Sequence, residues 1–84
     1  MYKVVSVKAT DDYKLLVTFD NGIVKEYDMK PKLNEWPFEL LKNKAFFKAV
    51  KVDPGGYGVS WNSEMDLSEY ELWKNGKEVN HSLN

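Results

Sequence analysis

Three glycines cluster in the segment DPGGYGVSW (residues 53–61), a composition found in loops that cradle a phosphate. A phosphate-binding loop needs its glycines to lead into a helix whose free N–H groups face the anion. Here they lead into YGVSW, where apolar residues alternate as in a strand, and no Gly-Lys-Ser/Thr follows. Pro54 presets the second position of a β-turn, and Gly55 suits the positive-φ position of a type II turn. The segment therefore predicts a turn between two strands.

Two aspartates, Asp28 and Asp66, are the next candidates for chemistry because each lies at the end of a predicted element. A pair of carboxylates could serve in acid–base catalysis or bind a divalent cation. Structural roles compete, since Asp28 precedes a turn whose N–H groups it can bind and Asp66 precedes the positive end of the last predicted helix. A ligand-binding or hydrolytic site would require Asp28, Asp66 and Trp61 to converge in one concave pocket, with at least one carboxylate pKa perturbed.

The single histidine, His81, lies in the polar stretch 77–84, and the chain contains no cysteine. A metal site or a nucleophile–base pair needs partners that are held rigidly together, which a polar tail does not provide. We therefore predict no catalytic residue, no metal site and no cofactor.

The length and net charge of the chain limit the classes of protein to which it can belong. The 84 residues suffice for one domain, and 12 basic against 13 acidic residues give a formal charge of −1. That balance lacks the basic field of a dedicated nucleic-acid binder. Apolar runs are too short for a membrane span or a signal peptide. We expect residues 1–76 to form a single α+β domain, with 77–84 as a polar C-terminal tail, in the cytoplasm.

The elements that would position these residues begin with three predicted strands in YKVVSVKATDDYKLLVTFDNGIVKEYDM, where apolar and polar residues alternate. Asp20-Asn21-Gly22 is a strong hairpin signal. A two-residue loop would set Leu15 opposite Asp28, whereas a three-residue loop with Gly22 in the left-handed conformation sets Leu15 opposite Tyr27. The second register keeps the apolar face continuous, so we predict it.

The remainder of the chain predicts a short helix, a second hairpin around the glycine turn, and a final helix. Trp36-Pro37 opens the short helix. Ser68 and Glu71 match the S-x-x-E capping box, in which each side chain binds the other residue's backbone N–H, and Asn75-Gly76 ends the last helix. The predicted fold is α+β, with a small antiparallel sheet (three N-terminal strands plus a C-terminal hairpin) and short helices in the order β-β-β-α-β-β-α.

The aromatic side chains are too numerous to be fully buried in so small a domain, which predicts an exposed patch of the kind that contacts a partner protein. Trp36 and Trp61 are the predicted anchors because tryptophan is over-represented at binding hot spots. Aromatic residues beside Lys14, Lys25 and Lys74 could instead stack on single-stranded nucleic acid. Interleaved acidic residues and the overall charge make nucleic acid the less favoured partner.

Taken together, the motifs resemble the bacterial Domain of Unknown Function 2442 family. The resemblance rests on VTFDNGIVKEYDMKP, on the F-x-x-L, F and V-x-V-D series of residues 38–53, and on the W-N-x-x-x-D-L segment of residues 61–67. It implies a small α+β domain with an antiparallel sheet, and it adds Asn62 to the candidate surface because Asn62 belongs to the last motif. Some members are encoded beside another small protein in the style of a toxin–antitoxin pair, which implies a protein partner.

We therefore predict a non-enzymatic protein-interaction module that binds a protein partner or a second copy of itself, through an aromatic face or an edge strand. The candidate surface consists of Trp36, Trp61, Asn62, Asp28 and Asp66. Two alternatives stay open: a small ligand-binding or hydrolytic domain that uses Asp28 and Asp66, and a weak nucleic-acid binder.

Overall fold

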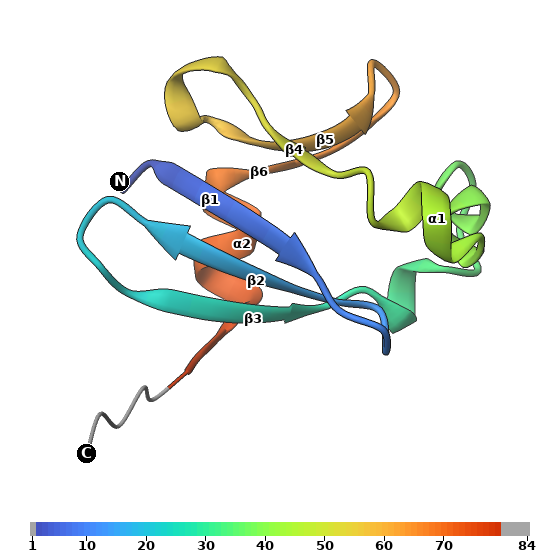
Figure 1. The fold of residues 1–84 in the computed structure, drawn as a ribbon, viewed down its shortest axis with the longest axis horizontal. Coiled ribbons are helices and arrows are strands. Elements are labelled where there is room, and N and C mark those ends of the chain that lie inside the picture. Colours follow the sequence, from blue (N-terminus) through green and yellow to red (C-terminus); the bar gives the residue numbers. More distant parts are fainter. Residues whose placement is uncertain (1, 80–84) are drawn as a thin grey trace.

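The computed structural model describes residues 2–79 of the chain. Within that range it is an α+β fold of seven strands in two antiparallel sheets, with two short α-helices and three 3-10 turns (Figure 1). The first sheet has the order β1 (Val4–Ala9), β2 (Lys14–Phe19), β3 (Val24–Asp28) and β7 (Lys77–Glu78). The second has the order β4 (Lys51–Val52), β5 (Gly58–Asn62) and β6 (Met65–Ser68).

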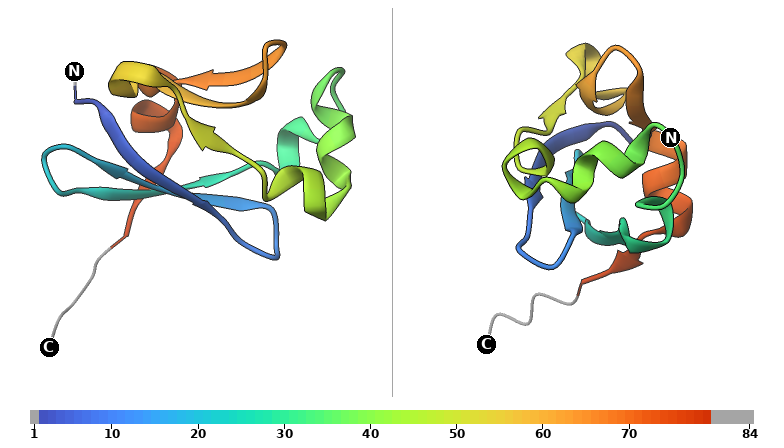
Figure 2. Two further views of the ribbon diagram at one scale, coloured as in Figure 1. Left: turned by 45° about the horizontal axis from the view of Figure 1, so that its top comes forward. Right: turned by 90° about the vertical axis from the view of Figure 1, so that its right-hand side faces the viewer.

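The helical elements are α1 (Lys44–Phe47) and α2 (Glu69–Asn75), and the 3-10 turns are η1 (Lys30–Lys32), η2 (Phe38–Lys42) and η3 (Pro54–Gly56). Residues 30–47 lie at one end of the two sheets, whereas α2 packs against β3, β5 and β6 (Figures 1 and 2). The predicted α+β class is confirmed. The strands are divided between two sheets, whereas the sequence predicted one.

The β2–β3 hairpin has the predicted register. Leu15 lies opposite Tyr27, and Gly22 has φ 87°. The Gly22 N–H donates to the Phe19 carbonyl at 2.9 Å, and the Phe19 N–H donates to the Ile23 carbonyl at 2.9 Å. The three-residue loop therefore places the apolar side chains of β2 and β3 on the inner face of the sheet.

The glycine-rich segment is a turn that leads into a strand, as predicted. Gly55 has φ 80° and ψ −4°, which are the dihedral angles of the third residue of a type II turn. The Gly56 N–H donates to the Asp53 carbonyl at 2.9 Å, and β5 follows directly. The 3-10 turn η3 leads into β5 and not into an α-helix, so the N–H groups of these glycines do not form the anion site of a phosphate loop.

Two strands were not in the predicted order. Residues 65–68 form β6, with Met65 and Leu67 buried and Asp66 and Ser68 exposed, an alternation too short to stand out in the sequence. Lys77–Glu78, the first residues of the stretch assigned to a polar tail, pair with β3 as β7. His81 lies outside the described residues.

The last helix begins at the predicted cap, but only half of the capping box forms. The Ser68 hydroxyl accepts a hydrogen bond from the Glu71 N–H at 3.1 Å. The Glu71 carboxylate is turned the other way and accepts a hydrogen bond from the Tyr27 hydroxyl on β3. A tertiary partner has therefore replaced the local one that the motif predicts.

The core lies between the two sheets and α2. Its fully buried side chains include Leu15, Val17 and Phe19 from β2, Val59 from β5 and Leu72 from α2. The helical end contributes further buried side chains, which are Met29, Leu33, Leu41 and Phe47. Because the segments that supply this core span the whole described chain, the two sheets and the helical end form a single packed unit.

Candidate functional site

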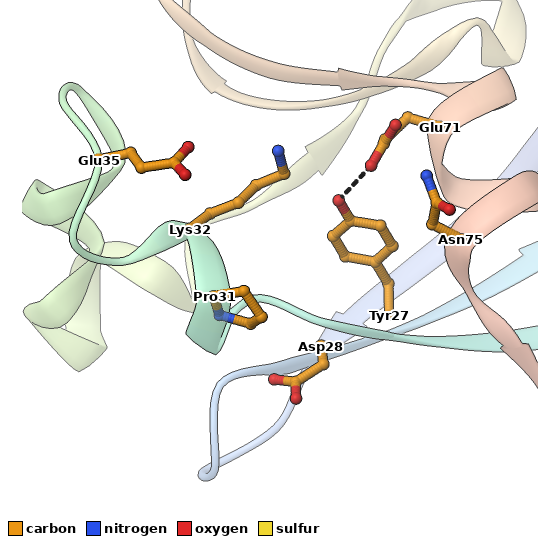
Figure 3. Close-up of a pocket in the computed structure, with 7 residues that line it drawn as sticks. All are labelled: Tyr27, Asp28, Pro31, Lys32, Glu35, Glu71 and Asn75. Atoms are coloured by element: carbon orange, nitrogen blue, oxygen red, sulfur yellow. Dashed lines mark hydrogen bonds between the residues drawn. The ribbon is translucent and has the colours of Figure 1, made fainter.

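A pocket of about 360 Å³ opens where the end of β3, the turn η1 and the helix α2 meet. Its lining consists of Tyr27, Asp28, Pro31, Lys32, Glu35, Glu71 and Asn75 (Figure 3). This volume is at the lower end of the range for small-molecule sites. The lining includes one candidate from the sequence, Asp28.

The inner wall of the pocket is formed by a hydrogen-bonded pair. Tyr27 is 4% exposed, and its hydroxyl donates to Glu71 Oε2 at 2.6 Å (Figure 3). Burial raises the pKa of Tyr27 well above its usual range, and the adjacent Glu71 carboxylate raises it further. The hydrogen bond from Tyr27 lowers the pKa of Glu71, with smaller contributions from Asn75 and Lys32.

These shifts decide what the pair can do chemically. The pKa of Tyr27 moves up and that of Glu71 moves down, so both move away from neutrality. An efficient general acid or base has a pKa close to the working pH. Tyr27 and Glu71 therefore hold fixed protonation states at neutral pH, as a donor and an anion, and suit orienting a group better than transferring a proton.

The outer wall of the pocket carries long side chains of both positive and negative charge. The Lys32 ammonium and the Glu35 carboxylate point toward the space in front of Tyr27 (Figure 3). Lys32 also lies over the Phe38 ring, with its Nζ 5.7 Å from the ring centroid. The lining thus presents three carboxylates, one ammonium group and one amide, which can hydrogen-bond a polar group of either charge.

Asp28 lines the pocket but its carboxylate is turned away from the Tyr27 hydroxyl (Figure 3). Asp28 Oδ1 accepts hydrogen bonds from the Lys30 backbone N–H at 3.0 Å and forms an ion pair with Lys30 Nζ at 3.2 Å. Desolvation alone would raise the pKa of Asp28, but the two Lys30 contacts outweigh it and the pKa lies below its ordinary value. The carboxylate therefore stabilises the turn after β3.

The structure does not bring the other predicted site residues to this pocket. Asp66 is exposed on β6, opposite Ser60. Trp61 is 7% exposed, and its Nε1–H donates to the Phe47 carbonyl at 2.8 Å inside the core. The convergence that the ligand-binding alternative required of Asp28, Asp66 and Trp61 is therefore not found.

The two remaining candidates have different positions. Asn62 Oδ1 accepts hydrogen bonds from the N–H groups of Glu64 and Met65, at 2.8 and 3.0 Å, and so closes the β5–β6 turn. Trp36, between η1 and η2, is 75% exposed. Of the two predicted tryptophan anchors, Trp36 is available for contact and Trp61 is a core residue.

Sequence reasoning missed Tyr27 and Glu71 as the centre of the pocket. The capping motif predicts a hydrogen bond between Glu71 and the Ser68 backbone, and the register of the hairpin predicts Tyr27 only as an apolar residue of the strand. The two lie 44 positions apart, so no local spacing connects them. Among residues 2–79, no group of three or more His, Cys, Asp or Glu side chains is placed to hold a metal ion, and no helix is long and apolar enough to cross a membrane.

The fold and the pocket define a small α+β domain in which one C-terminal helix joins two antiparallel sheets. Residues 4–78 match the family model described as Protein of unknown function (DUF2442), and the chain belongs to that family. The match runs from β1 through β7, so it takes in both sheets and the pocket, and it confirms the resemblance stated from the motifs. No curated protein and no solved structure matches the chain.

Proposed function

We propose that this protein is a non-enzymatic interaction module of the cytoplasm that binds and regulates a partner protein, in the manner of one member of a toxin–antitoxin pair. The observation that carries the proposal is the exposure of Trp36. Its side chain is 75% exposed at the helical end, and Leu40 in η2, four positions along, is 55% exposed. Tryptophan is enriched at the hot spots of protein interfaces, so an exposed tryptophan on a well-packed domain is a candidate contact residue.

The energetic argument favours a protein contact at this surface. Covering an exposed tryptophan and leucine together removes on the order of 150 Å² of apolar surface from water, which stabilises a complex by roughly 4 kcal/mol before ordering costs. Glu35 directly precedes Trp36 and Glu39 directly precedes Leu40, and both glutamates are exposed, so each apolar side chain has a charged neighbour in the chain. An apolar centre with a polar rim is the usual arrangement of a protein–protein interface.

The nucleic-acid alternative has less support. Lys14 Nζ lies 3.8 Å from an Asp12 oxygen and 3.7 Å from a Glu26 oxygen, so its charge is matched by two carboxylates. Lys25 Nζ donates to the Trp73 carbonyl at 2.9 Å, at the C-terminal end of α2. A strand of phosphates is recognised by a row of cations with no competing anions, which these lysines do not supply.

Mass in solution tests the proposal. Light scattering after gel filtration, over a range of protein concentrations, should report a stable homodimer, or a complex when the product of the neighbouring gene is added. Trp36→Ala should abolish the homodimer or complex. It should leave the thermal unfolding midpoint unchanged, because the Trp36 side chain is exposed and is not part of the core. Val5→Ala is the control, since Val5 in β1 is another exposed apolar side chain, at 55% exposure.

Two results would count against the proposal. One is a protein that stays monomeric at every concentration and does not bind the product of the neighbouring gene. The other is a complex that Trp36→Ala and Val5→Ala weaken equally, since that would place the contact elsewhere on the domain.

A further inference from the structure

The pocket between η1 and α2 holds charges of both signs that are not paired with one another. Lys32 belongs to η1, Glu35 to the segment that follows it, and Glu71 to α2. Their charged groups lie around the space in front of the Tyr27 hydroxyl (Figure 3). In the described part of the chain, residues 2–79, these three side chains take part in no ion pair, although four other lysines do: Lys3, Lys14, Lys30 and Lys48.

The charges of Lys32 and Glu35 nevertheless act on the hydrogen-bonded pair at the inner wall. The pKa of Glu71 is lowered chiefly by the hydrogen bond from Tyr27, and the Lys32 ammonium lowers it further. The pKa of Tyr27 is raised chiefly by burial, and the carboxylates of Glu71 and Glu35 raise it further. The four groups therefore form one electrostatic cluster around the pocket, in which opposite charges face each other without closing the space between them.

The rest of the lining adds apolar surface and no further free charge. The Asp28 carboxylate is turned away and forms an ion pair with Lys30 at 3.2 Å (Figure 3). The rings of Tyr27 and Pro31 supply the apolar walls of a pocket of about 360 Å³. Small-molecule sites typically combine such walls with a few polar groups that converge from different elements.

We propose that this pocket binds a small zwitterion of the class of a free α-amino acid, with the ligand's carboxylate on Lys32 and its ammonium group between Glu71 and Glu35. A ligand with only a positive charge would be attracted by the glutamates and repelled by Lys32, and one with only a negative charge would meet the reverse. A zwitterion places each of its charges against an opposite one. Its side chain lies against the rings of Tyr27 and Pro31.

This inference goes beyond the proposed function, because it gives the pocket a ligand and requires no partner protein. The two can fail separately. A titration of the chain with a small molecule is independent of the association that depends on Trp36, and loss of that association leaves the titration unaffected.

Nuclear magnetic resonance titration of the isotope-labelled full chain tests the inference with three probes: L-leucine, isopentylamine and isocaproate. The probes share one branched hydrocarbon group, but isopentylamine lacks the carboxylate of leucine and isocaproate lacks its ammonium group. At neutral pH, L-leucine should give saturable shifts of the backbone N–H signals of Lys32, Glu35 and Glu71. Each of the other two probes should bind about tenfold more weakly, because each loses one charge-assisted contact.

Charge-removing variants assign each contact to its residue. Lys32→Gln should weaken leucine binding about fivefold to tenfold without weakening the binding of isopentylamine, which has no carboxylate for Lys32 to hold. Glu35→Gln should weaken leucine binding without weakening the binding of isocaproate. Lys42→Gln and Glu39→Gln are the matched controls, because both residues are exposed in η2, outside the pocket lining, and each substitution changes the net charge in the same way.

Several results would overturn the inference. They are the absence of saturable shifts with L-leucine, shifts that do not centre on the pocket lining, and binding of isopentylamine or isocaproate as tight as that of leucine. Equal effects of the pocket variants and their controls would also overturn it. Lys32 is only half-buried and Glu35 is exposed, so both variants should fold, and the amide spectrum of each variant verifies that before titration.

Discussion

The hydrogen bond between Tyr27 and Glu71 is expected to be the main polar link between β3 and α2, and Tyr27→Phe removes it with little change in shape. The Tyr27 hydroxyl is buried and lies 2.6 Å from a carboxylate whose pKa is lowered, so the bond is charge-assisted. Such bonds contribute about 1.5–3 kcal/mol when buried, and the partial exposure of Glu71 reduces this to about 1–2 kcal/mol. We expect the substitution to lower the melting temperature by roughly 5–10 °C.

The pH dependence of this effect is its most specific signature. Because the pKa of Glu71 is lowered in the folded protein, its contribution to the free energy of unfolding is fully present above the unfolded-state pKa. It is lost as the pH falls through the folded-state pKa. The difference in stability between wild type and Tyr27→Phe should therefore be largest near about pH 7 and should shrink as the pH is lowered toward about 2.

Urea denaturation of both proteins across that pH range measures the difference directly. Tyr70→Phe serves as the control, because it removes a tyrosine hydroxyl from an exposed side chain and should change stability by less than about 0.5 kcal/mol. A Tyr27→Phe effect that is absent, or that stays constant with pH, would refute the conclusion that this charge-assisted bond stabilises the contact between β3 and α2.

The other predictions concern the glycines and Trp61, and chemical denaturation measures each. Gly58→Ala would place a Cβ 2.3 Å from the Leu67 carbonyl oxygen, between β5 and β6, and should destabilise by about 2–3 kcal/mol. Gly22→Ala meets no atom within 4 Å but forces an alanine to φ 87°, so we expect a smaller cost of about 1 kcal/mol; the reverse order would contradict the close strand approach at Gly58. Trp61→Phe leaves the Phe47 carbonyl without its donor and opens space in the core, which should cost about 2 kcal/mol, whereas Trp36→Phe should cost less than about 0.5 kcal/mol. If the two substitutions lower the free energy of unfolding equally, Trp61 is not the more buried of the two tryptophans.

Local sequence signals were sufficient where the interacting residues are close along the chain. The β2–β3 register followed from Gly22 and the alternation around it, because a one-residue slip would have turned Leu15 out of the core. The turn at Gly55 and the helix cap at Ser68 depend on neighbours within a few residues. Both can therefore be predicted from the local sequence. The short strand β6 was missed because four residues carry too little periodicity to separate a strand from a loop.

The candidate site was less predictable for a reason that the tryptophans illustrate. Trp36 and Trp61 are the same residue type in similarly mixed surroundings, and yet one is 75% exposed and the other 7%. What separates them is whether a distant segment covers them: α1 supplies the Phe47 ring and carbonyl that enclose Trp61. Burial of an aromatic side chain is a property of the assembled core, and the local sequence does not encode it alone.

By itself, then, the sequence determined the α+β class, the family, the hairpin register and the turns, since each depends on short-range geometry or on a motif. Only the tertiary structure decided that Tyr27 and Glu71 form the inner wall of the pocket, that Asp66 lies apart from Asp28, and that the strands divide between two sheets. The physical reason is that these outcomes depend on contacts between segments tens of residues apart. Such contacts are selected by the joint packing of the whole core.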